Sequence, residues 1–448
     1  MTATRTSDGT AHFVDRHKEF SANGAGGTPE WLKHLREVAI ERFAEQGFPT
    51  TRQEEWRLTS VKRIAEHPFA LPHAADTMTP DQLTPFLLPS EEPVRLVFVN
   101  GIFVPGLSHT ASLPAGVQVR NLAAALAEDA PLIEKHLGKH ADMDRNPFTA
   151  LNTAFVGDGA FVYVPANTLV EQPVECVFFS TSGEEPVMSH PRNLVVVENG
   201  GRLAFIETYG GTARRPYLTN AVTEVVVGDN ARVDCYRIQR EGEQAFHIAT
   251  TTSTQGRDSR YSLTPIVLGA SLSRHYILMG MNGEGGEGTL NGLYLMSGDQ
   301  HVDHNTVIDH AVPHCDSHEY FNGVLAGRSH AVFSGKIVVR PGAQKTDSKQ
   351  TNNNLLLSDD ARADSQPQLE IYADDVRCTH GATLGPLDED ALFYLRTRGL
   401  DRERANALLT YGFGVEILNR VALPELRERL DTLVKERLHD FSRMRVAG

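Results

Sequence analysis

A thiol and an imidazole stand two residues apart near the C-terminal end of the chain, at Cys378 and His380. If this segment is extended, both side chains project to the same side, because alternate residues of a strand face one way. Iron accepts thiolate and imidazole ligands, and the neighbouring Arg377 could lower the pKa of the thiol. A bare C-x-H pair is more often a buried thiol beside a capping histidine, so the surrounding sequence has to decide between the two interpretations.

A second group of potential metal ligands is crowded into residues 301–318. It consists of His301, Asp303, His304, His310, His314, Cys315, Asp316 and His318. Imidazole, carboxylate and thiolate groups all bind zinc or iron. In a strand, however, His301 and Asp303 would share one face and His304 the other, so one metal centre would need stacked coils to collect its ligands. We therefore favour polar ladders and turn contacts, and keep His301, His304, His310 and His314 as weak metal-ligand candidates.

Motifs for nucleotide or acyl chemistry give no active site. Gly283–Gly288 matches GxGxxG, but a strand-like run follows it, and Glu284 and Glu287 would repel a pyrophosphate, so we predict a β turn there. The sequence has no GxxxxGK[ST] loop and no GxSxG elbow. We therefore expect a chain that binds no nucleotide itself and is not an enzyme.

Composition excludes further classes of function. The 448 residues carry a formal net charge of −14, which disfavours a nucleic-acid partner. The four cysteines, Cys176, Cys235, Cys315 and Cys378, form no CxxC pair and suggest a reducing compartment. The first residues lack a secretory signal, and no window reaches the roughly 18 apolar residues of a membrane span. We expect a cytoplasmic protein without a membrane partner.

The elements that position these side chains are β-rich from about residue 151 to 384. Short runs such as 194–197 and 224–227 are bounded by turn signals such as Asn199–Gly201. Many successive turns are about 28–32 residues apart, a spacing that suits a solenoid of stacked β coils. A β-sandwich or a jelly roll would also give short strands and Gly-rich turns.

Helical patterns flank this β region. Residues 1–28 are polar and Gly-rich and indicate a flexible lead, and 29–47 form an amphipathic helix that ends near Gly47. After residue 385, Asp388 and Asp401 can cap two helices, and Pro424 can stand in the first turn of a third. The apolar stripes of these helices fit a cap on the β core, a docking surface for another protein, or both.

Several segments, in the same order over most of the chain, resemble the SufB/SufD family of iron–sulfur cluster assembly proteins. They are FPTTRQEEWR at 48–57, HVDHNT at 301–306, HAVPH at 310–314, FSGK at 333–336, SKQTNNNLLLS at 348–358, QPQLEI at 366–371, VRCTHGAT at 376–383 and FYLRTRG at 393–399. The resemblance implies a right-handed parallel β-helix core at 151–384, between a mainly helical region at 1–150 and a helical region at 385–448. It also implies that the chain acts as a scaffold protein.

SufB proteins often carry a cysteine motif near the N-terminus, so the absence of a cysteine before Cys176 favours the SufD branch.

By the same resemblance, the partners are SufB, which joins through the edge of the β-helix, and the SufC ATPase. SufC is expected on the C-terminal helices, at Leu408, Leu409, Phe413 and Ile417. Without SufB, the open strand edges favour a homodimer. A transient nascent iron–sulfur cluster, shared with SufB, would form at the SufB–SufD interface. His380 is then the cluster residue of this chain and Cys378 its neighbour, while the main cysteine ligand comes from SufB.

Two other functions stay open at this point. β-helices often host polysaccharide lyases and hydrolases, so the chain could be a carbohydrate-active enzyme; activity on acidic polysaccharides would favour that reading. It could also be a stand-alone metal-binding protein that uses residues 301–318. Stoichiometric metal, lost when His304 and His310 are changed, would favour that alternative.

Overall fold

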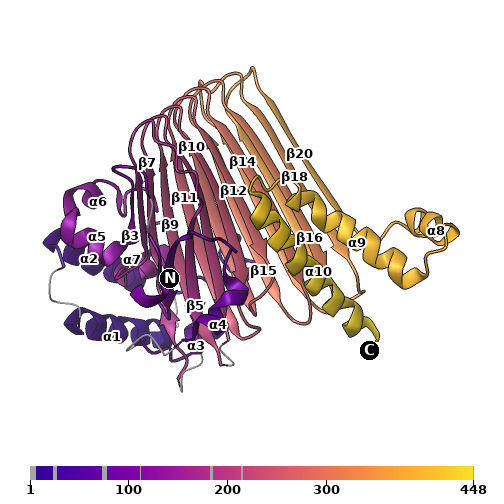
Figure 1. The fold of residues 1–448 in the computed structure, drawn as a ribbon, viewed down its shortest axis with the longest axis horizontal. Coiled ribbons are helices and arrows are strands. Elements are labelled where there is room, and N and C mark those ends of the chain that lie inside the picture. Colours follow the sequence, from indigo (N-terminus) through magenta and orange to yellow (C-terminus); the bar gives the residue numbers. More distant parts are fainter. Residues whose placement is uncertain are drawn as a thin grey trace.

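The β core passes back and forth between two sheets (Figure 1). Each sheet has ten strands. The computed structural model describes residues 7–23, 28–72, 78–110, 113–181, 185–212 and 215–446. Sheet 1 has the strand order β2-β1-β5-β8-β10-β12-β14-β16-β18-β20, and sheet 2 has the order β19-β17-β15-β13-β11-β9-β7-β4-β3 with β6 paired to β9. From β7 onward, consecutive strands alternate between the sheets and each pairs in parallel with the strand two further along. The chain is therefore wound as a parallel solenoid.

The strands keep a constant register along the solenoid. Sheet 1 contains β1 (Val94–Val99), β2 (Ile102–Phe103), β5 (Val174–Ser180), β8 (Arg202–Gly211), β10 (Arg232–Arg240), β12 (Arg260–Val267), β14 (Glu287–Met296), β16 (Asp316–Leu325), β18 (Asp347–Leu356) and β20 (Arg377–Gly385). Sheet 2 contains β3 (Gln118–Asn121), β4 (Ala160–Val164), β6 (Met188–Ser189), β7 (Arg192–Val197), β9 (Tyr217–Val227), β11 (Ala245–Gln255), β13 (Leu272–Met281), β15 (His301–His310), β17 (His330–Val339) and β19 (Arg362–Ile371). Paired residues such as Leu290 and Glu319 are separated by one coil of about 30 residues, the period of a solenoid repeat.

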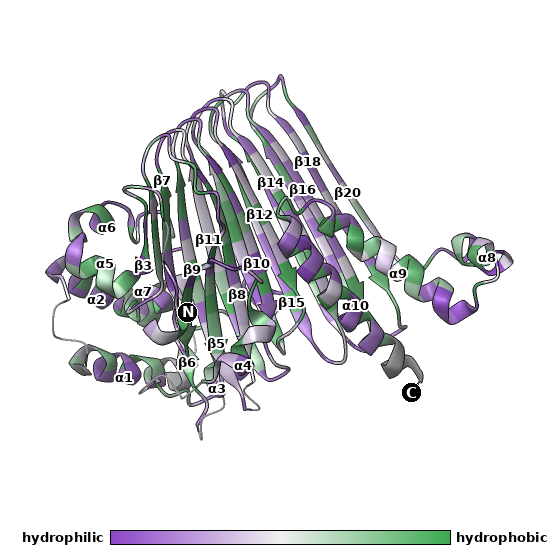
Figure 2. Ribbon diagram, viewed as in Figure 1, coloured by the Kyte–Doolittle hydropathy of each residue, from purple (hydrophilic) through white to green (hydrophobic). Residues whose placement is uncertain are grey.

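The predicted mainly β fold, a parallel β-helix core with helical ends, is confirmed. A sandwich or jelly roll is excluded, because those folds are built from antiparallel strands. Here antiparallel pairing joins only β1 to β2 and β3 to β4 within the described sheets. Of the turn predicted at Gly283–Gly288, the first residues connect β13 to β14, whereas Glu287 and Gly288 already begin β14. Figure 2 shows that hydrophilic residues become prominent toward β18 and β20, where the sequence of β18 is DSKQTNNNLL.

Helices cover the outer faces of both sheets. The N-terminal region contributes α1 (Ser7–Asn23), α2 (Glu30–Gln46), η1 (Glu54–Trp56), α3 (Lys62–Glu66), α4 (Pro80–Leu83), η2 (Thr84–Phe86), η3 (Pro105–Leu107), α5 (Leu122–Glu128), α6 (Ala130–His136) and α7 (Pro147–Ala154). Aromatic side chains from α1, α2, η1 and α7 pack on outward residues of sheet 2, including Phe246 and Ile248. The C-terminal region contributes α8 (Glu389–Thr397), α9 (Arg402–Leu418) and α10 (Pro424–Val446). Among the described residues, no helix is both long and apolar enough to cross a membrane.

The predicted flexible lead over residues 1–28 is wrong for most of its length. Ser7–Asn23 form α1, and the Phe13 side chain is fully buried. Its ring packs edge to face on Phe43 and Phe48, so contacts with residues far along the chain hold α1 in place. The local sequence is rich in polar residues and glycine, and its composition gives no sign of these long-range contacts. Residues 1–6 and 24–27 lie outside the described residues.

A buried ion pair attaches the N-terminal helices to the solenoid. Arg192 of β7 and Glu224 of β9 are 1% and 0% exposed, and Arg192 Nη2 donates to Glu224 Oε1 over 2.6 Å. The Glu224 carboxylate also accepts backbone N–H bonds from Gly138 and His140 after α6. Arg192 Nη1 donates to the side chains of Asn152 and Thr153 in α7. Burial disfavours the charge of Glu224, yet Arg192 and the backbone donors hold the pKa of the carboxyl below its ordinary value.

We predict that Arg192→Met lowers the free energy of unfolding by about 3–5 kcal/mol, because it leaves a buried carboxylate without its counter-charge. Urea unfolding followed by circular dichroism measures the loss. The control is Arg328→Met, which breaks the exposed pair with Asp299 and is expected to cost less than about 1 kcal/mol. Equal losses for the two variants would contradict an anchoring role for Arg192.

Candidate functional site

The solenoid is open at its C-terminal end. β20 is the last strand of sheet 1 and β19 the last strand of sheet 2, and no further coil follows among the described residues. The inward side chains of β18, such as Gln350 and Asn352, are buried, whereas the residues of β20 are mostly exposed. The interior of the solenoid thus reaches the surface at this end.

Cys378 and His380 lie side by side on the inward face of this last coil. Cys378 is in register with the buried Ser348, and His380 with the buried Gln350, so both side chains continue interior rows. Cys378 is half-buried and His380 is exposed. The predicted lowering of the thiol pKa by Arg377 is wrong: burial, and then the carboxylate of Asp347, raise the pKa of Cys378.

Hydrogen-bonded polar side chains lead from the core to these two residues. Ser317 Oγ and Ser348 Oγ are 2.7 Å apart in the row that ends at Cys378, and His310 Nε2 is 2.9 Å from Ser317 Oγ. In the row that ends at His380, Gln350 Nε2 donates to Glu319 Oε2 over 2.6 Å. Burial raises the pKa of Glu319 to about 7. Sequence reasoning missed these partners, although the alternation of Ser348, Gln350 and Asn352 would have placed them on one face.

The histidines of residues 301–318 do not form one cluster. His301 faces outward, 3.0 Å from Thr59 Oγ1, while His304 is fully buried in the interior. His310 bonds to Ser317, and His314 is exposed at a corner, 3.8 Å from Glu284. Within the described ranges, no group of three or more potential ligands is placed to hold a metal ion. Cys378 and His380 offer one sulfur and one nitrogen ligand, which is fewer than the four that a closed zinc or iron–sulfur site needs.

The two free strand edges differ in their capacity to pair. Each presents backbone N–H and C=O groups that can extend a sheet into another chain. Pro367 in β19 has no N–H, so the row of donors in that strand has a gap. β20 contains no proline over Arg377–Gly385. The strand that carries Cys378 and His380 is therefore the better template for an added strand.

The C-terminal helices have one buried part and one exposed part. Of the four residues predicted to dock a partner, Ile417 is fully buried against sheet 1 with Val324 and Leu355, so its side chain is not available to a partner in this structure. Leu409 and Phe413 are half-buried, and Leu408 is 49% exposed. Burying one face of α9 on the solenoid leaves its other face, with Leu408, toward solvent.

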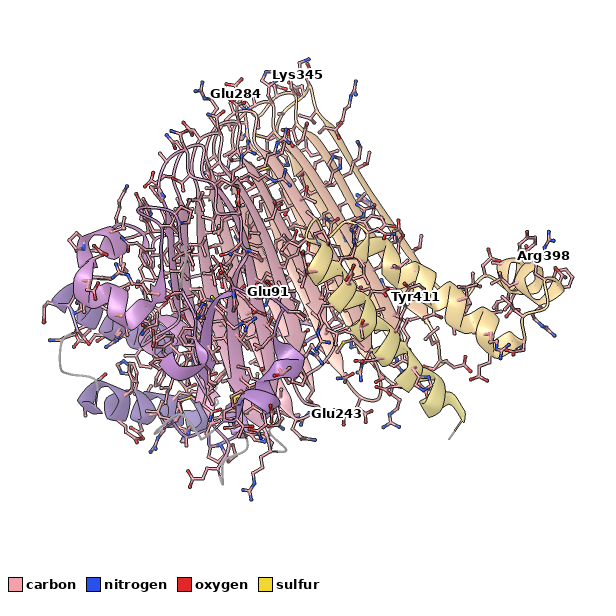
Figure 3. All side chains as sticks on the ribbon, in the orientation of Figure 1. Glu91, Glu243, Glu284, Lys345, Arg398 and Tyr411 are labelled. Carbon is pink, nitrogen blue, oxygen red and sulfur yellow. The ribbon has the colours of Figure 1, made fainter. Side chains whose placement is uncertain are left out.

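Sequence reasoning missed two larger exposed apolar residues. Phe393 and Tyr394 of α8 are 68% and 57% exposed. Figure 3 shows Arg398, directly after α8, standing away from the solenoid. Helical spacing does not tell which neighbours a helix finds, so it could not distinguish these two exposed residues from buried ones.

Comparison with known proteins gives matches over nearly the whole chain. The model of the SufBD protein N-terminal region matches residues 8–176, and the model described as "SUF system FeS cluster assembly, SufBD core domain" matches residues 178–413. An iron–sulfur cluster assembly SufBD family protein of Synechocystis is 36% identical over 409 residues, covering 89% of each chain.

Two further relatives carry the name iron–sulfur cluster assembly protein SufD. The protein of Escherichia coli is 27% identical over 424 residues, covering 94% of this chain and 96% of the relative. The protein of Bacillus subtilis is 27% identical over 438 residues, covering 95% and 96%. The two family models together match most of the chain, and the chain belongs to the SufBD family of the SUF system for iron–sulfur cluster assembly.

Proposed function

We propose that this chain is a cytoplasmic scaffold subunit that pairs with SufB at the open end of its solenoid and binds the SufC ATPase through its C-terminal arm. A nascent iron–sulfur cluster is the cargo of this assembly. The observation that carries the proposal is the placement of Cys378 and His380 on the inward face of the last coil, beside a free strand edge. The direct test is co-purification with SufB and SufC from the same cell.

The ligand count supports a shared site. One thiol and one imidazole can complete a coordination sphere but cannot close one, so the remaining ligands have to come from another chain. A SufB strand added to β20 would bring its residues next to Cys378 and His380. Without SufB, a second copy of this chain would satisfy the same edge. The chain's own part is to present the two donors and to exclude water once the interface forms.

The C-terminal arm supports the SufC contact. α10 and the buried face of α9 rest on sheet 1, while α8 precedes α9 in the chain and packs on it. Phe393 and Tyr394 of α8 and Leu408 of α9 are exposed apolar residues of this arm, and exposed apolar surface commonly marks protein–protein contacts. Because α8 directly follows β20, a partner that moves this arm also acts on the strand that carries His380.

We predict that His380→Ala folds normally, because the exposed side chain leaves no cavity, and that it lowers cluster assembly at least about tenfold. Cys378→Ser is expected to be milder, since SufB supplies the principal thiolate. The measurement is the activity of iron–sulfur enzymes in cells that rely on this system alone. The control is His314→Ala, a similarly exposed histidine at a corner. Full activity with His380→Ala would contradict the proposed role.

The pairing at β20 is tested at Ala382, an exposed inward position in register with Asn352. We predict that Ala382→Lys abolishes pairing with SufB, and any homodimer, because a partner strand would bury the added charge. Ala382→Ser, which adds no charge, is the control. Light scattering after size-exclusion chromatography measures the masses. If Ala382→Lys still pairs, the interface lies elsewhere.

For the arm, we predict that Phe393→Asp and Leu408→Asp each weaken SufC binding at least about tenfold, as the loss of a central interface residue does. Calorimetric titration measures the affinity. Leu169→Asp is the matched control, because Leu169 is 51% exposed and Leu408 is 49% exposed. Single substitutions are more specific than a truncation of residues 400–448, because the truncation would also uncover the apolar face of sheet 1. Unchanged affinity in both variants would place the ATPase contact elsewhere.

A further inference from the structure

The interior row that ends at His380 changes character along the solenoid. Its members, in register from coil to coil, are Phe205, Cys235, Leu263, Leu290, Glu319, Gln350 and His380. The first four are apolar, and the last three can hydrogen-bond. Glu319 and Gln350 are each 2% exposed. A buried carboxyl and a buried amide destabilise the fold unless they are hydrogen-bonded. A physical reason is therefore needed for their position on the two coils that precede the exposed imidazole of His380.

The Gln350 amide is held from two sides. On the inner side, its Nε2 donates to Glu319 Oε2 over 2.6 Å. Across the interior it meets Gly335 of β17, where a Cβ atom would collide with Gln350 Nε2. A carboxylate can only accept hydrogen bonds, so Glu319 in its ionised form requires the NH₂ end of the amide to face it.

The other end of this amide is unused inside the described chain. Gln350 Oε1 is buried and has no hydrogen-bond partner there. His380 is the register partner of Gln350 on the next coil, about 4.8 Å further along the solenoid axis. An N–H of the imidazole is a donor of the kind that Oε1 lacks. An imidazole that donates from one nitrogen keeps the lone pair of the other for a metal.

We propose that Glu319 and Gln350 are positioning residues for His380. Glu319 fixes the orientation of the Gln350 amide, and Gln350 Oε1, which no donor reaches in this structure, accepts from one ring nitrogen of His380 when the exposed ring turns toward it, and so selects its tautomer. This inference rests on the proposed cluster role of His380 for its purpose, but its structural content can be tested without any cluster. The nitrogen that is left free faces the open end, where the cargo would be bound.

The test is ¹⁵N NMR of the full chain with ¹⁵N-labelled histidine, at a pH where the His380 ring is neutral, with the resonance assigned by its loss in His380→Ala. The tautomer ratio of His380 is expected to differ roughly fivefold from that of the exposed reference His314, the shift that one hydrogen bond gives. Gln350→Leu removes the acceptor. Glu319→Gln has the same shape but no longer dictates which end of the Gln350 amide faces it. Both variants should bring the tautomer ratio to that of the exposed reference His314.

The control is Lys349→Met, on the same strand but with its side chain facing outward and 57% exposed, which should leave the ratio unchanged. If Gln350→Leu does not fold, Glu319→Gln carries the test. A ratio that stays at the wild-type value in folded Gln350→Leu, or in Glu319→Gln, would overturn the inference.

Cluster assembly in cells separates this inference from the proposed function. If His380→Ala keeps full assembly, the cluster role fails, whatever the tautomer ratio. If His380→Ala impairs assembly but Gln350→Leu changes neither assembly nor the ratio, the cluster role stands and the positioning ladder fails. The expected result is that Gln350→Leu and Glu319→Gln lower both the ratio and assembly, the latter about tenfold, as outer-shell partners of a metal ligand do.

Discussion

The backbone of a parallel solenoid is satisfied only by the coils before and after each strand, and this requirement determines what its two ends can do. At the N-terminal end, the short antiparallel strands β2 and β3 finish the two sheets. At the C-terminal end, β19 and β20 have no successor in the described chain, so their outer N–H and C=O groups remain available. An end with unpaired strands attracts another chain. The candidate ligands Cys378 and His380 lie on one of these strands, so pairing at β20, as proposed above, would also complete the site.

The two interior rows that end at Cys378 and His380 change with distance from that end. Around Tyr261 and Leu263 both rows are apolar and packed, although the buried Arg237–Glu207 ion pair lies in the interior nearby. From Ser317 and Glu319 onward both rows consist of hydrogen-bonded polar side chains. Such groups are tolerated because each coil can provide partners for the next. These polar rows end at a surface that water would contact in the isolated chain and that a partner would bury in a complex.

The outer faces of the coils impose a second constraint. Strands of a parallel sheet are usually covered on both faces, and here the N-terminal helices cover sheet 2 while α9 and α10 cover sheet 1. The Arg192–Glu224 pair joins the first of these covers to the coils. One face of α9, which includes Ile417, covers sheet 1. Leu408 and α8 are not part of this covering face, so their exposed side chains can contact another protein.

From the sequence alone, turns about 30 residues apart indicated a solenoid, because local features that repeat need no tertiary information. They did not exclude a sandwich or a jelly roll, and the resemblance to the SufB/SufD family decided for the parallel β-helix. The sequence also placed Cys378 and His380 on one face, because alternation in a strand needs no tertiary information. It did not predict α1, whose position depends on Phe13 meeting Phe43 and Phe48. Nor did it distinguish the buried Ile417 from the exposed Phe393, or join Glu319 and Gln350 to His380. Those relations connect residues one or more coils apart, and only the stacking of the coils sets which side chains meet and which remain in solvent.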